Sequence, residues 1–238
     1  MTNPTSSPSA APAFSVLLFD FEGTLVDFQW KLPEAVQEAR GELRRLGFQA
    51  ISEAADYAGI YNQTMQMAAQ FGLDPHHLTA RLGAIYDRYD RDAATRWSVR
   101  PGAAALLARW QQMHAARFGL VSNIGRRALD EALPRLGLAG LFDVIISRNE
   151  VTLLKPFGEG LRRAMRGLSA APARTLFVGD SVTDILAAKD AGIPAAIIQG
   201  GESPSAALAA AGPAYLWKSI ADLETCLDGG AAISPLTN

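Results

Sequence analysis

Short apolar stretches recur along this chain and alternate with longer stretches that have the periodicity of helices. This alternation restricts the fold more than any other feature of the sequence, because it is typical of strands joined by crossover helices. Several short stretches, such as VLLF and AAII, are apolar at every position, as expected for parallel strands covered on both faces. The pattern therefore predicts an α/β fold with a doubly wound, Rossmann-like parallel sheet. The candidate strands are Ser15–Phe19, Arg117–Val121, Asp143–Ser147, Thr175–Val178, Ala195–Gln199 and Ala214–Trp217.

Residues 30–97 interrupt this alternation, because they have helical patterning and no convincing strand. Pro33 is suited to open one helix and Gly47 to end it, and Asp74, which precedes a proline, indicates the start of another. A crossover between parallel strands needs only about a dozen residues, so an insertion of this length exceeds an ordinary connection. We therefore expect a separate helical cap. The predicted division is a core of residues 15–29 and 98–238 and a cap of residues 30–97.

The composition excludes several classes of protein. Of the 238 residues, 49% are hydrophobic and 19% are charged, which allows a substantial core and argues against disorder. Because 22 Lys and Arg residues nearly balance 24 Asp and Glu residues and are scattered, we expect neither a nucleic-acid nor a membrane partner. The single cysteine, Cys226, cannot form an intramolecular disulfide. The first 14 residues have the composition of a flexible tail rather than a secretory signal, so a cytoplasmic location is expected.

Polar residues follow four of the predicted strands. Ligands of open α/β sheets bind beyond the carboxyl ends of the strands, so these residues are expected to meet at one edge. In chain order they are Asp20 and Glu22 after the first strand, Ser122 and Asn123 after the second, Lys155 beyond the third, and Asp180 and Asp184 beyond the fourth.

The four segments resemble, in the same order, the four motifs of the haloacid dehalogenase superfamily. They read DFEGTLVD, SN, KP and GDSVTD, and the insertion after the first is similar to the family's small helical C1 cap. Each motif alone arises often by chance, but the ordered set, each at a strand end, is specific. The resemblance covers residues 15 to about 217, and the nearest subgroup is the phosphoglycolate phosphatase-like hydrolases. It implies that Asp20 is a nucleophile that forms an aspartyl-phosphate.

The resemblance also implies roles for the other motif residues. Ser122, Asn123 and Lys155 would hold the phosphoryl oxygens and stabilise charge in the transition state. Gly23 would let backbone amides approach the phosphate. Glu22 occupies the position at which the family's phosphatases have an aspartate that protonates the leaving oxygen and then activates water. Misplacing a reacting group by about 1 Å can cost roughly a hundredfold in rate, so the longer side chain puts turnover in question.

The resemblance to the family also implies a Mg²⁺ site. Asp20 and Asp180 are the expected direct ligands, with the backbone carbonyl of Glu22 as a third and Asp184 bound directly or through water. Ligation by oxygen alone suits Mg²⁺. The formal net charge of −2 therefore conceals a local excess of four carboxylates opposed only by Lys155, and a bound cation would supply the missing positive charge.

Three of the motif residues could instead have purely structural roles, and the sequence leaves both possibilities open. Asp184 could serve the first turn of the following helix, where a negative charge suits the helix dipole. Ser122 could cap the helix that begins near Gly125, and Lys155 could be a solvated charge. The segment KPFGEG also lacks the acidic residue and second proline that usually follow Lys-Pro in the family.

Three hypotheses about function follow. The first is a Mg²⁺-dependent phosphatase that acts on a small phosphorylated metabolite entering between cap and core. The second is a phosphate-compound binding protein with little turnover, because Glu22 replaces the aspartate. The third is a phosphomutase or dehalogenase using the same nucleophile. In relatives with this cap, specificity residues often follow its first helix, which here indicates Gly47-Phe48-Gln49.

Overall fold

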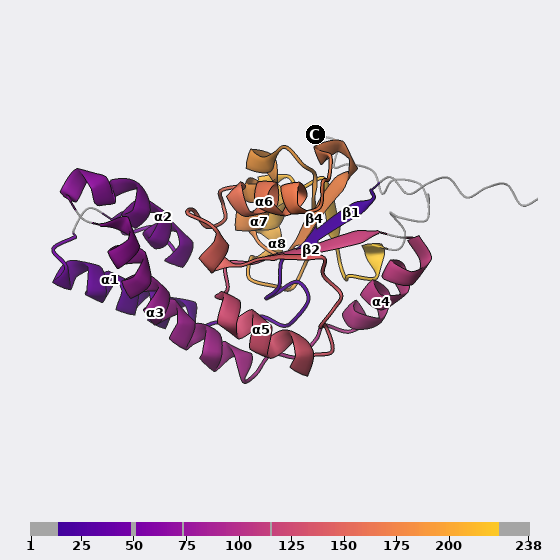
Figure 1. The fold of residues 1–238 in the computed structure, drawn as a ribbon, viewed down its shortest axis with the longest axis horizontal. Coiled ribbons are helices and arrows are strands. Elements are labelled where there is room, and N and C mark those ends of the chain that lie inside the picture. Colours follow the sequence, from indigo (N-terminus) through magenta and orange to yellow (C-terminus); the bar gives the residue numbers. More distant parts are fainter. Residues whose placement is uncertain (1–13, 49–50, 73, 115, 224–238) are drawn as a thin grey trace, which may run out of the picture.

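Six parallel strands form one sheet in the computed structural model, which describes residues 14–48, 51–72, 74–114 and 116–223 (Figure 1). The strands are β1 (Val16–Phe19), β2 (Arg117–Val121), β3 (Val144–Ile146), β4 (Thr175–Gly179), β5 (Ala195–Ile198) and β6 (Tyr215–Trp217). Their order in the sheet is β3-β2-β1-β4-β5-β6, so the four strands followed by motif residues are neighbours. The predicted fold class is confirmed, and every predicted strand is found within one residue of its expected ends. Cys226 and the first 13 residues of the expected tail lie outside the described residues.

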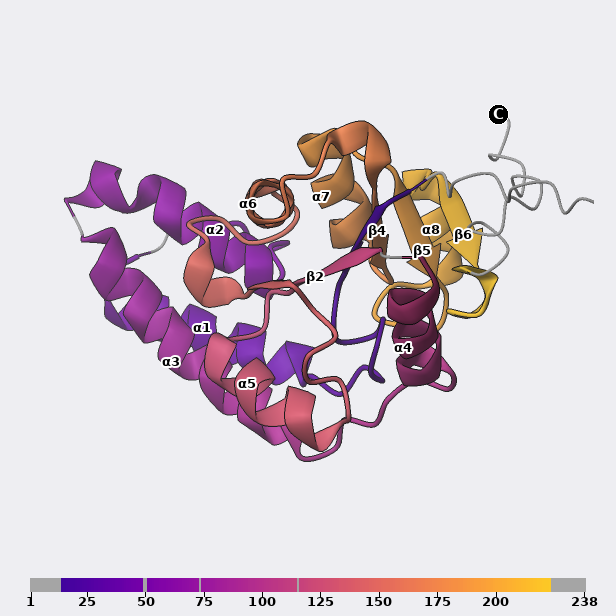
Figure 2. The ribbon, with the colours of Figure 1, turned by 45° about the vertical axis from the view of Figure 1, so that its right-hand side comes forward.

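Helices cover both faces of the sheet, as the apolar strands require (Figures 1 and 2). Leu17 and Leu18 are neighbours in β1, both are fully buried, and they belong to separate hydrophobic clusters. Because successive side chains of a strand point to opposite faces, both faces of β1 lie inside the protein. The helices are α4 (Ala103–His114) and α5 (Arg126–Arg135) on one side, and α6 (Glu159–Gly167), α7 (Val182–Ala191) and α8 (Ser205–Ala211) on the other.

A helical insertion separates β1 from α4 and lies beside the sheet (Figure 1). It comprises α1 (Leu32–Arg45), α2 (Tyr57–Met67), a short 3-10 helix (Ala68–Phe71) and α3 (Pro75–Ala94). Gly47 has φ +78° just after the end of α1, and the Asp74 side chain caps α3 by accepting from the His76 N–H at 3.0 Å. Between residues 30 and 97 the described residues form no strand, as predicted. No helix in the described ranges has the length and apolarity needed to cross a membrane.

The chain leaves the core and returns to it through two linkers that lie side by side. Val26 pairs with Val99 in an isolated antiparallel bridge. The Asp27 N–H donates to the Ser98 carbonyl at 3.1 Å, and the Ser98 N–H donates to Asp27 Oδ1 at 2.7 Å. Paired linkers of this kind suit a hinge. The division into a core and a cap at these positions stays a prediction.

A buried ion pair joins α3 to the core. Asp90, from α3, accepts from Arg148 Nη2 at 2.7 Å and from the Gly125 N–H at 2.9 Å through Oδ2. Its other oxygen accepts from Trp30 Nε1 at 2.9 Å. Arg148 also donates to the carbonyl of Asn123 at 2.8 Å. Both charged side chains are buried. Losing Arg148 would leave the Asp90 charge uncompensated, and losing Asp90 would leave Arg148 with the half-exposed Asp87 as its remaining ionic partner.

We predict that Asp90→Asn lowers the free energy of unfolding by about 2–4 kcal/mol, somewhat less than for a wholly unpaired buried charge, because the buried Arg148 would keep only the half-exposed Asp87 as an ionic partner. The matched control is Asp92→Asn on the same helix. Asp92 is 39% exposed and pairs with Lys31 and Arg96, so its loss should cost about 0–1 kcal/mol. Chemical denaturation of the three proteins measures both values. Equal losses in the two variants would contradict the account.

Candidate active site

Asp20 stands at the carboxyl end of the central strand. Its N–H donates to the Val178 carbonyl of the neighbouring β4 at 2.9 Å, which extends the sheet bonding by one residue beyond β1. Asp20 is only 7% exposed, and its side chain receives a hydrogen bond from Lys155 Nζ at 2.6 Å. The pKa of Asp20 is raised to about 6, chiefly by burial, against the opposing effect of Lys155.

Lys155, between β3 and α6, is buried between two carboxylates. Its Nζ lies 2.6 Å from Asp20 Oδ1 and 2.6 Å from Asp184 Oδ1. Burial by itself would lower the pKa of the ammonium, but the attraction of Asp184 and Asp20 outweighs it and raises the pKa above its ordinary value. The side chain is 6% exposed, so the alternative of a solvated lysine is wrong.

Asp184 caps the start of α7 with one carboxylate oxygen and bonds to Lys155 with the other. Its Oδ2 accepts from Ser181 Oγ at 2.7 Å and from the Ser181 N–H at 3.1 Å, completing a capping box at the start of α7. Its Oδ1 faces Lys155 in the site. The helix-start hypothesis and the site hypothesis for Asp184 are therefore compatible, because each uses a different oxygen.

Asp180, at the end of β4, is held on both oxygens. Thr24 Oγ1 donates to Oδ1 at 2.9 Å, and the Glu202 N–H donates to Oδ2 at 2.6 Å. Burial, together with the nearby carboxylates Asp184 and Asp20, raises the pKa of Asp180 well above its usual range.

Gly23 lies in the turn after Asp20 and packs against Asp180. Its N–H donates to the Val26 carbonyl at 2.8 Å. Its φ is +83°, and a Cβ there would lie 2.2 Å from Asp180 Oδ2, so only glycine fits against this carboxylate. Gly23 is therefore required for the packing around Asp180, and its expected part in letting backbone amides approach a phosphate stays a prediction.

Ser122 and Asn123 follow β2 at the same edge. Ser122 Oγ accepts from the Ile124 N–H at 3.3 Å, whereas α5 begins after Gly125 without a side-chain cap, so Ser122 does not cap that helix. Asn123 Oδ1 accepts from the Lys155 N–H at 3.1 Å, and its Nδ2 donates to the Tyr57 hydroxyl at 3.1 Å. Asn123 thus connects the second strand to the lysine loop and to α2.

Glu22 lies in the same cavity as Asp20 but also reaches the two linkers. Its Oε1 accepts from Trp97 Nε1 at 2.8 Å and from the Gln29 N–H at 2.7 Å. Burial raises the pKa of Glu22 to about 8, although these two hydrogen bonds oppose the change. Glutamate is one methylene longer than aspartate, and its carboxyl oxygen makes hydrogen bonds with the linkers.

These side chains surround a small cavity of about 30 Å³. Five predicted residues line it directly, whereas Asp180 and Asp184 lie just beside it, bonded to other members of the site. The lining residues expected from the sequence are Asp20, Glu22, Ser122, Asn123 and Lys155; those not expected are Phe28, Tyr57, Ile124, Ser181, Thr183 and Glu202.

Of the unexpected lining residues, Glu202 could have been predicted from the sequence and Tyr57 could not. Glu202 follows β5, so the rule that inspects strand ends would have found it had it been applied to the fifth strand. Tyr57 starts α2 in the insertion, and no local pattern distinguishes it from other aromatic residues there. Its hydroxyl reaches the site only because α2 packs over the sheet edge.

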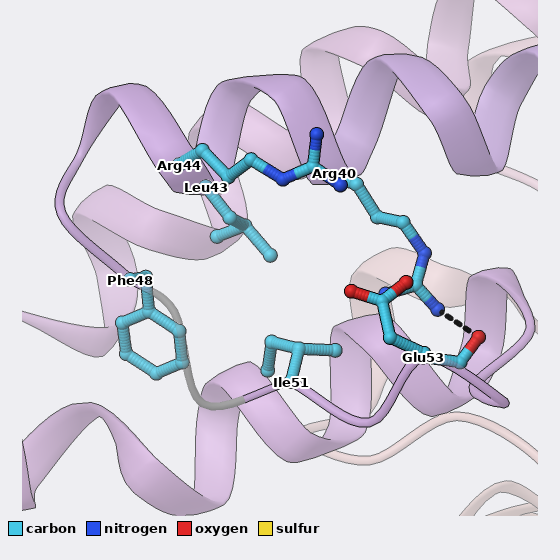
Figure 3. A pocket seen from close by; sticks show the side chains of 6 residues that line it. All are labelled: Arg40, Leu43, Arg44, Phe48, Ile51 and Glu53. Atoms are coloured by element: carbon cyan, nitrogen blue, oxygen red, sulfur yellow. Dashed lines mark hydrogen bonds and ion pairs between the residues drawn. The ribbon is translucent and has the colours of Figure 1, made fainter.

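A larger cavity of about 340 Å³ lies within the insertion and holds none of the motif residues (Figure 3). Arg40 donates to the carbonyls of Ser52 and Glu53 beside it, at 2.8 and 2.9 Å. Phe48, from the segment expected to set specificity, lines this cavity and not the one at the sheet edge, and Gln49 lies outside the described residues. The six lining residues are Arg40, Leu43, Arg44, Phe48, Ile51 and Glu53.

The carboxylates at the sheet edge fit a hard divalent cation. Asp20, Asp180 and Asp184 each offer an oxygen, and these oxygens lie within 4.8 Å of one another. All three side chains are buried, and burial raises the pKa of Asp20 and of Asp180. Oxygen-only donors that repel one another in a buried place match the ligand preference of Mg²⁺.

A parallel α/β sheet whose strand ends hold an aspartate, a buried lysine and an acidic cluster defines a class of hydrolases. The sequence profile of the haloacid dehalogenase-like hydrolases matches residues 14–192, and the chain belongs to this family. It is similar to a phosphoglycolate phosphatase of Synechococcus elongatus, with 31% identity over 212 residues, covering 87% of this chain and 94% of that protein.

Two further comparisons agree with this assignment. An N-acetylmuramic acid 6-phosphate phosphatase of Pseudomonas putida is 31% identical over 188 residues, covering 78% of this chain and 82% of the relative. A solved hydrolase structure from Pseudomonas syringae has a TM-score of 0.65 at 18% identity, covering 89% of this chain and 96% of that one. At that identity the structural match supports the fold alone.

Proposed function

We propose that this enzyme is a Mg²⁺-dependent phosphatase that hydrolyses a small phosphorylated metabolite through an aspartyl-phosphate on Asp20. The observation that carries the proposal is the Lys155 ammonium, 2.6 Å from both Asp20 and Asp184, in a cavity that Glu22 also lines. The family assignment and two relatives that are named phosphatases support it.

Each step uses a residue at the sheet edge. The Asp20 carboxylate attacks phosphorus, and the bond from phosphorus to the leaving oxygen breaks. Glu22 gives its proton to that oxygen and then takes a proton from the water that attacks the aspartyl-phosphate. Lys155 holds the phosphoryl oxygens through both displacements, together with Ser122 and the Asn123 amide. The second displacement releases phosphate and restores Asp20.

The carboxylates of Asp20, Asp180 and Asp184 would hold the Mg²⁺ ion. When bound, it supplies positive charge that offsets the approach of a phosphoryl dianion to these acids. Thr24 and the Glu202 N–H each donate a hydrogen bond to one oxygen of Asp180, and these bonds orient the carboxylate for binding the ion.

Substrate entry requires the cap to move. The cavity of about 30 Å³ has room for a few water molecules, each of which needs roughly 10–15 Å³, and is too small for a phosphoester. Asn62 of α2 exchanges two hydrogen bonds with the Leu154 backbone, at 3.0 and 2.7 Å, and Tyr57 bonds to Asn123. These contacts must break when the cap swings on the linkers at Asp27 and Ser98.

A binding protein with little turnover is the second candidate, because Glu22 Oε1 already accepts two hydrogen bonds from the hinge. The proposal predicts an active wild-type enzyme in which Glu22→Gln lowers kcat for an aryl phosphate by about 10²–10⁴-fold. Glu22→Asp should lose reach to Trp97 and gain no activity. An inactive wild type that Glu22→Asp activates would favour the binding protein instead.

Asp20→Asn should abolish the hydrolysis of p-nitrophenyl phosphate in the presence of Mg²⁺, because the amide cannot attack phosphorus. The expected loss in kcat is at least about a thousandfold. Asp130→Asn on the surface of α5 is the control, since that side chain is 59% exposed, and it should keep full activity. Substantial turnover by Asp20→Asn would rule out the aspartyl-phosphate route.

Metal binding can be measured without any substrate. Mg²⁺ at about a hundred times its Kd should stabilise the fold by about 2.7 kcal/mol, a rise in Tm of several degrees. Asp180→Asn should remove this rise. Asp190→Asn is the matched control, because that aspartate is exposed on α7 and bonds to Arg162 and the Gly158 N–H. An undiminished rise in Asp180→Asn would place the ion elsewhere.

A further inference from the structure

The two carboxyl oxygens of Glu22 have different surroundings. Oε1 accepts two hydrogen bonds, one from Trp97 Nε1 at 2.8 Å and one from the Gln29 N–H at 2.7 Å. Among the described residues, no donor bonds to Oε2. Because an oxygen that accepts from two N–H groups is poorly placed to carry the proton of the carboxyl, that proton belongs on the other oxygen. Oε2 is therefore the atom from which Glu22 can give a proton.

The Trp97 ring is held in place by the turn that carries Glu22. Trp97 is 4% exposed, and its ring meets the ring of Phe21 edge to face, with centroids 5.0 Å apart and planes at 87°. Phe21 is fully buried, and its carbonyl accepts from the N–H groups of Leu25 and Val26 at 2.8 and 3.1 Å. An edge-to-face pair of this kind favours one orientation of the rings. The indole N–H therefore has a fixed direction, toward Glu22.

The side chains of Glu22 and Trp97 are matched in length. An aspartate is shorter by one C–C bond, about 1.5 Å. From the same backbone position its oxygens would fall short of Trp97 Nε1, and the buried indole N–H would lose its partner. A glutamate at position 22 and a tryptophan at position 97 thus form one arrangement, in which each side chain depends on the other.

We propose that Trp97 is a positioning residue of the phosphatase reaction proposed above, on which this inference rests. Its N–H holds Oε1 and thereby sets the place of Oε2, which gives its proton to the leaving oxygen. Without the indole, the Gln29 N–H is the remaining donor to Oε1, and the long Glu22 side chain can turn about its torsions. A displacement of about 1 Å can cost roughly a hundredfold in rate.

Two aryl phosphates of similar size separate this role from a structural one. p-Nitrophenolate leaves readily without a proton because its nitro group delocalises the charge, whereas phenolate depends more on protonation. The value of kcat/KM includes the step in which Asp20 bonds to phosphorus, the bond to the phenolic oxygen breaks and Oε2 gives that oxygen its proton. A fault in the position of Oε2 therefore lowers kcat/KM more for phenyl phosphate than for p-nitrophenyl phosphate.

With the full chain and Mg²⁺, Trp97→Phe should lower kcat/KM for phenyl phosphate by about 10–100-fold. For p-nitrophenyl phosphate the loss should be about threefold or less. Equal losses for the two esters would overturn the inference, because a general defect in folding or substrate binding lowers both values alike.

Trp217→Phe is the matched control. Trp217, at the end of β6, is 1% exposed, and within the described residues its Nε1 has no hydrogen-bond partner. The substitution removes a buried indole without removing a hydrogen bond of this kind, so the ratio of the two kcat/KM values should stay as in the wild type even if Tm falls. A change in this ratio as large as that in Trp97→Phe would contradict the inference.

Two further variants test whether the indole acts through Glu22. Adding Trp97→Phe to Glu22→Gln should lower kcat/KM for phenyl phosphate no further, because the proton to be positioned is already gone, and a full additional loss would refute the inference. Glu22→Asp keeps the indole and breaks the same bond, so it provides the test if Trp97→Phe does not fold. It should also lower the value for phenyl phosphate more than that for p-nitrophenyl phosphate, and an unchanged ratio would refute the inference.

The same assays keep the two proposals apart. A wild type that hydrolyses neither ester would refute the phosphatase proposal, and the inference would fail with it. A wild type that hydrolyses both esters, with equal losses in Trp97→Phe, would refute the inference about Trp97 alone.

Discussion

The site depends on one buried ammonium group. Lys155 lies 2.6 Å from an oxygen of Asp20 and from one of Asp184, and these two acids follow the neighbouring strands β1 and β4. Without the lysine, three buried carboxylates would face one another with no fixed positive charge, a costly arrangement. The lysine also needs both acids, because a buried cation without partners would be equally unfavourable. The strand ends are therefore held together by charge as well as by the sheet.

The same residues connect the sheet edge to the helical insertion. Asn123 fixes the backbone of Lys155 through its side-chain oxygen and binds Tyr57 of α2 through its nitrogen. Its own carbonyl accepts from Arg148, which is paired with Asp90 of α3. One asparagine thus contacts the lysine loop and, directly or through one arginine, two helices of the insertion. Under the proposed function, these contacts would couple the position of the insertion to the order of the phosphoryl site.

The sheet was predictable because its strands are apolar on both faces, as Leu17 and Leu18 show, and this signal is local in sequence. The strand-end rule then located Asp20 and Lys155, since parallel strands bring their carboxyl ends to one edge. The Asp90–Arg148 ion pair could not be predicted from the sequence, because 58 residues separate its partners and no local sequence pattern marks either residue. The close approach of Asp180 to Gly23 could not be predicted either, because it is visible only in three dimensions.

The central claim is that Asp20 carries the phosphoryl group between two displacements. Rapid acid quenching of the enzyme during turnover with Mg²⁺, followed by mass spectrometry of its peptides, tests this claim most directly. The account predicts a phosphorylated peptide that contains Asp20 and loses its phosphate on treatment with hydroxylamine, as an acyl phosphate does. A phosphoryl group on another residue, or none on Asp20 while turnover proceeds at the quench time, would contradict it.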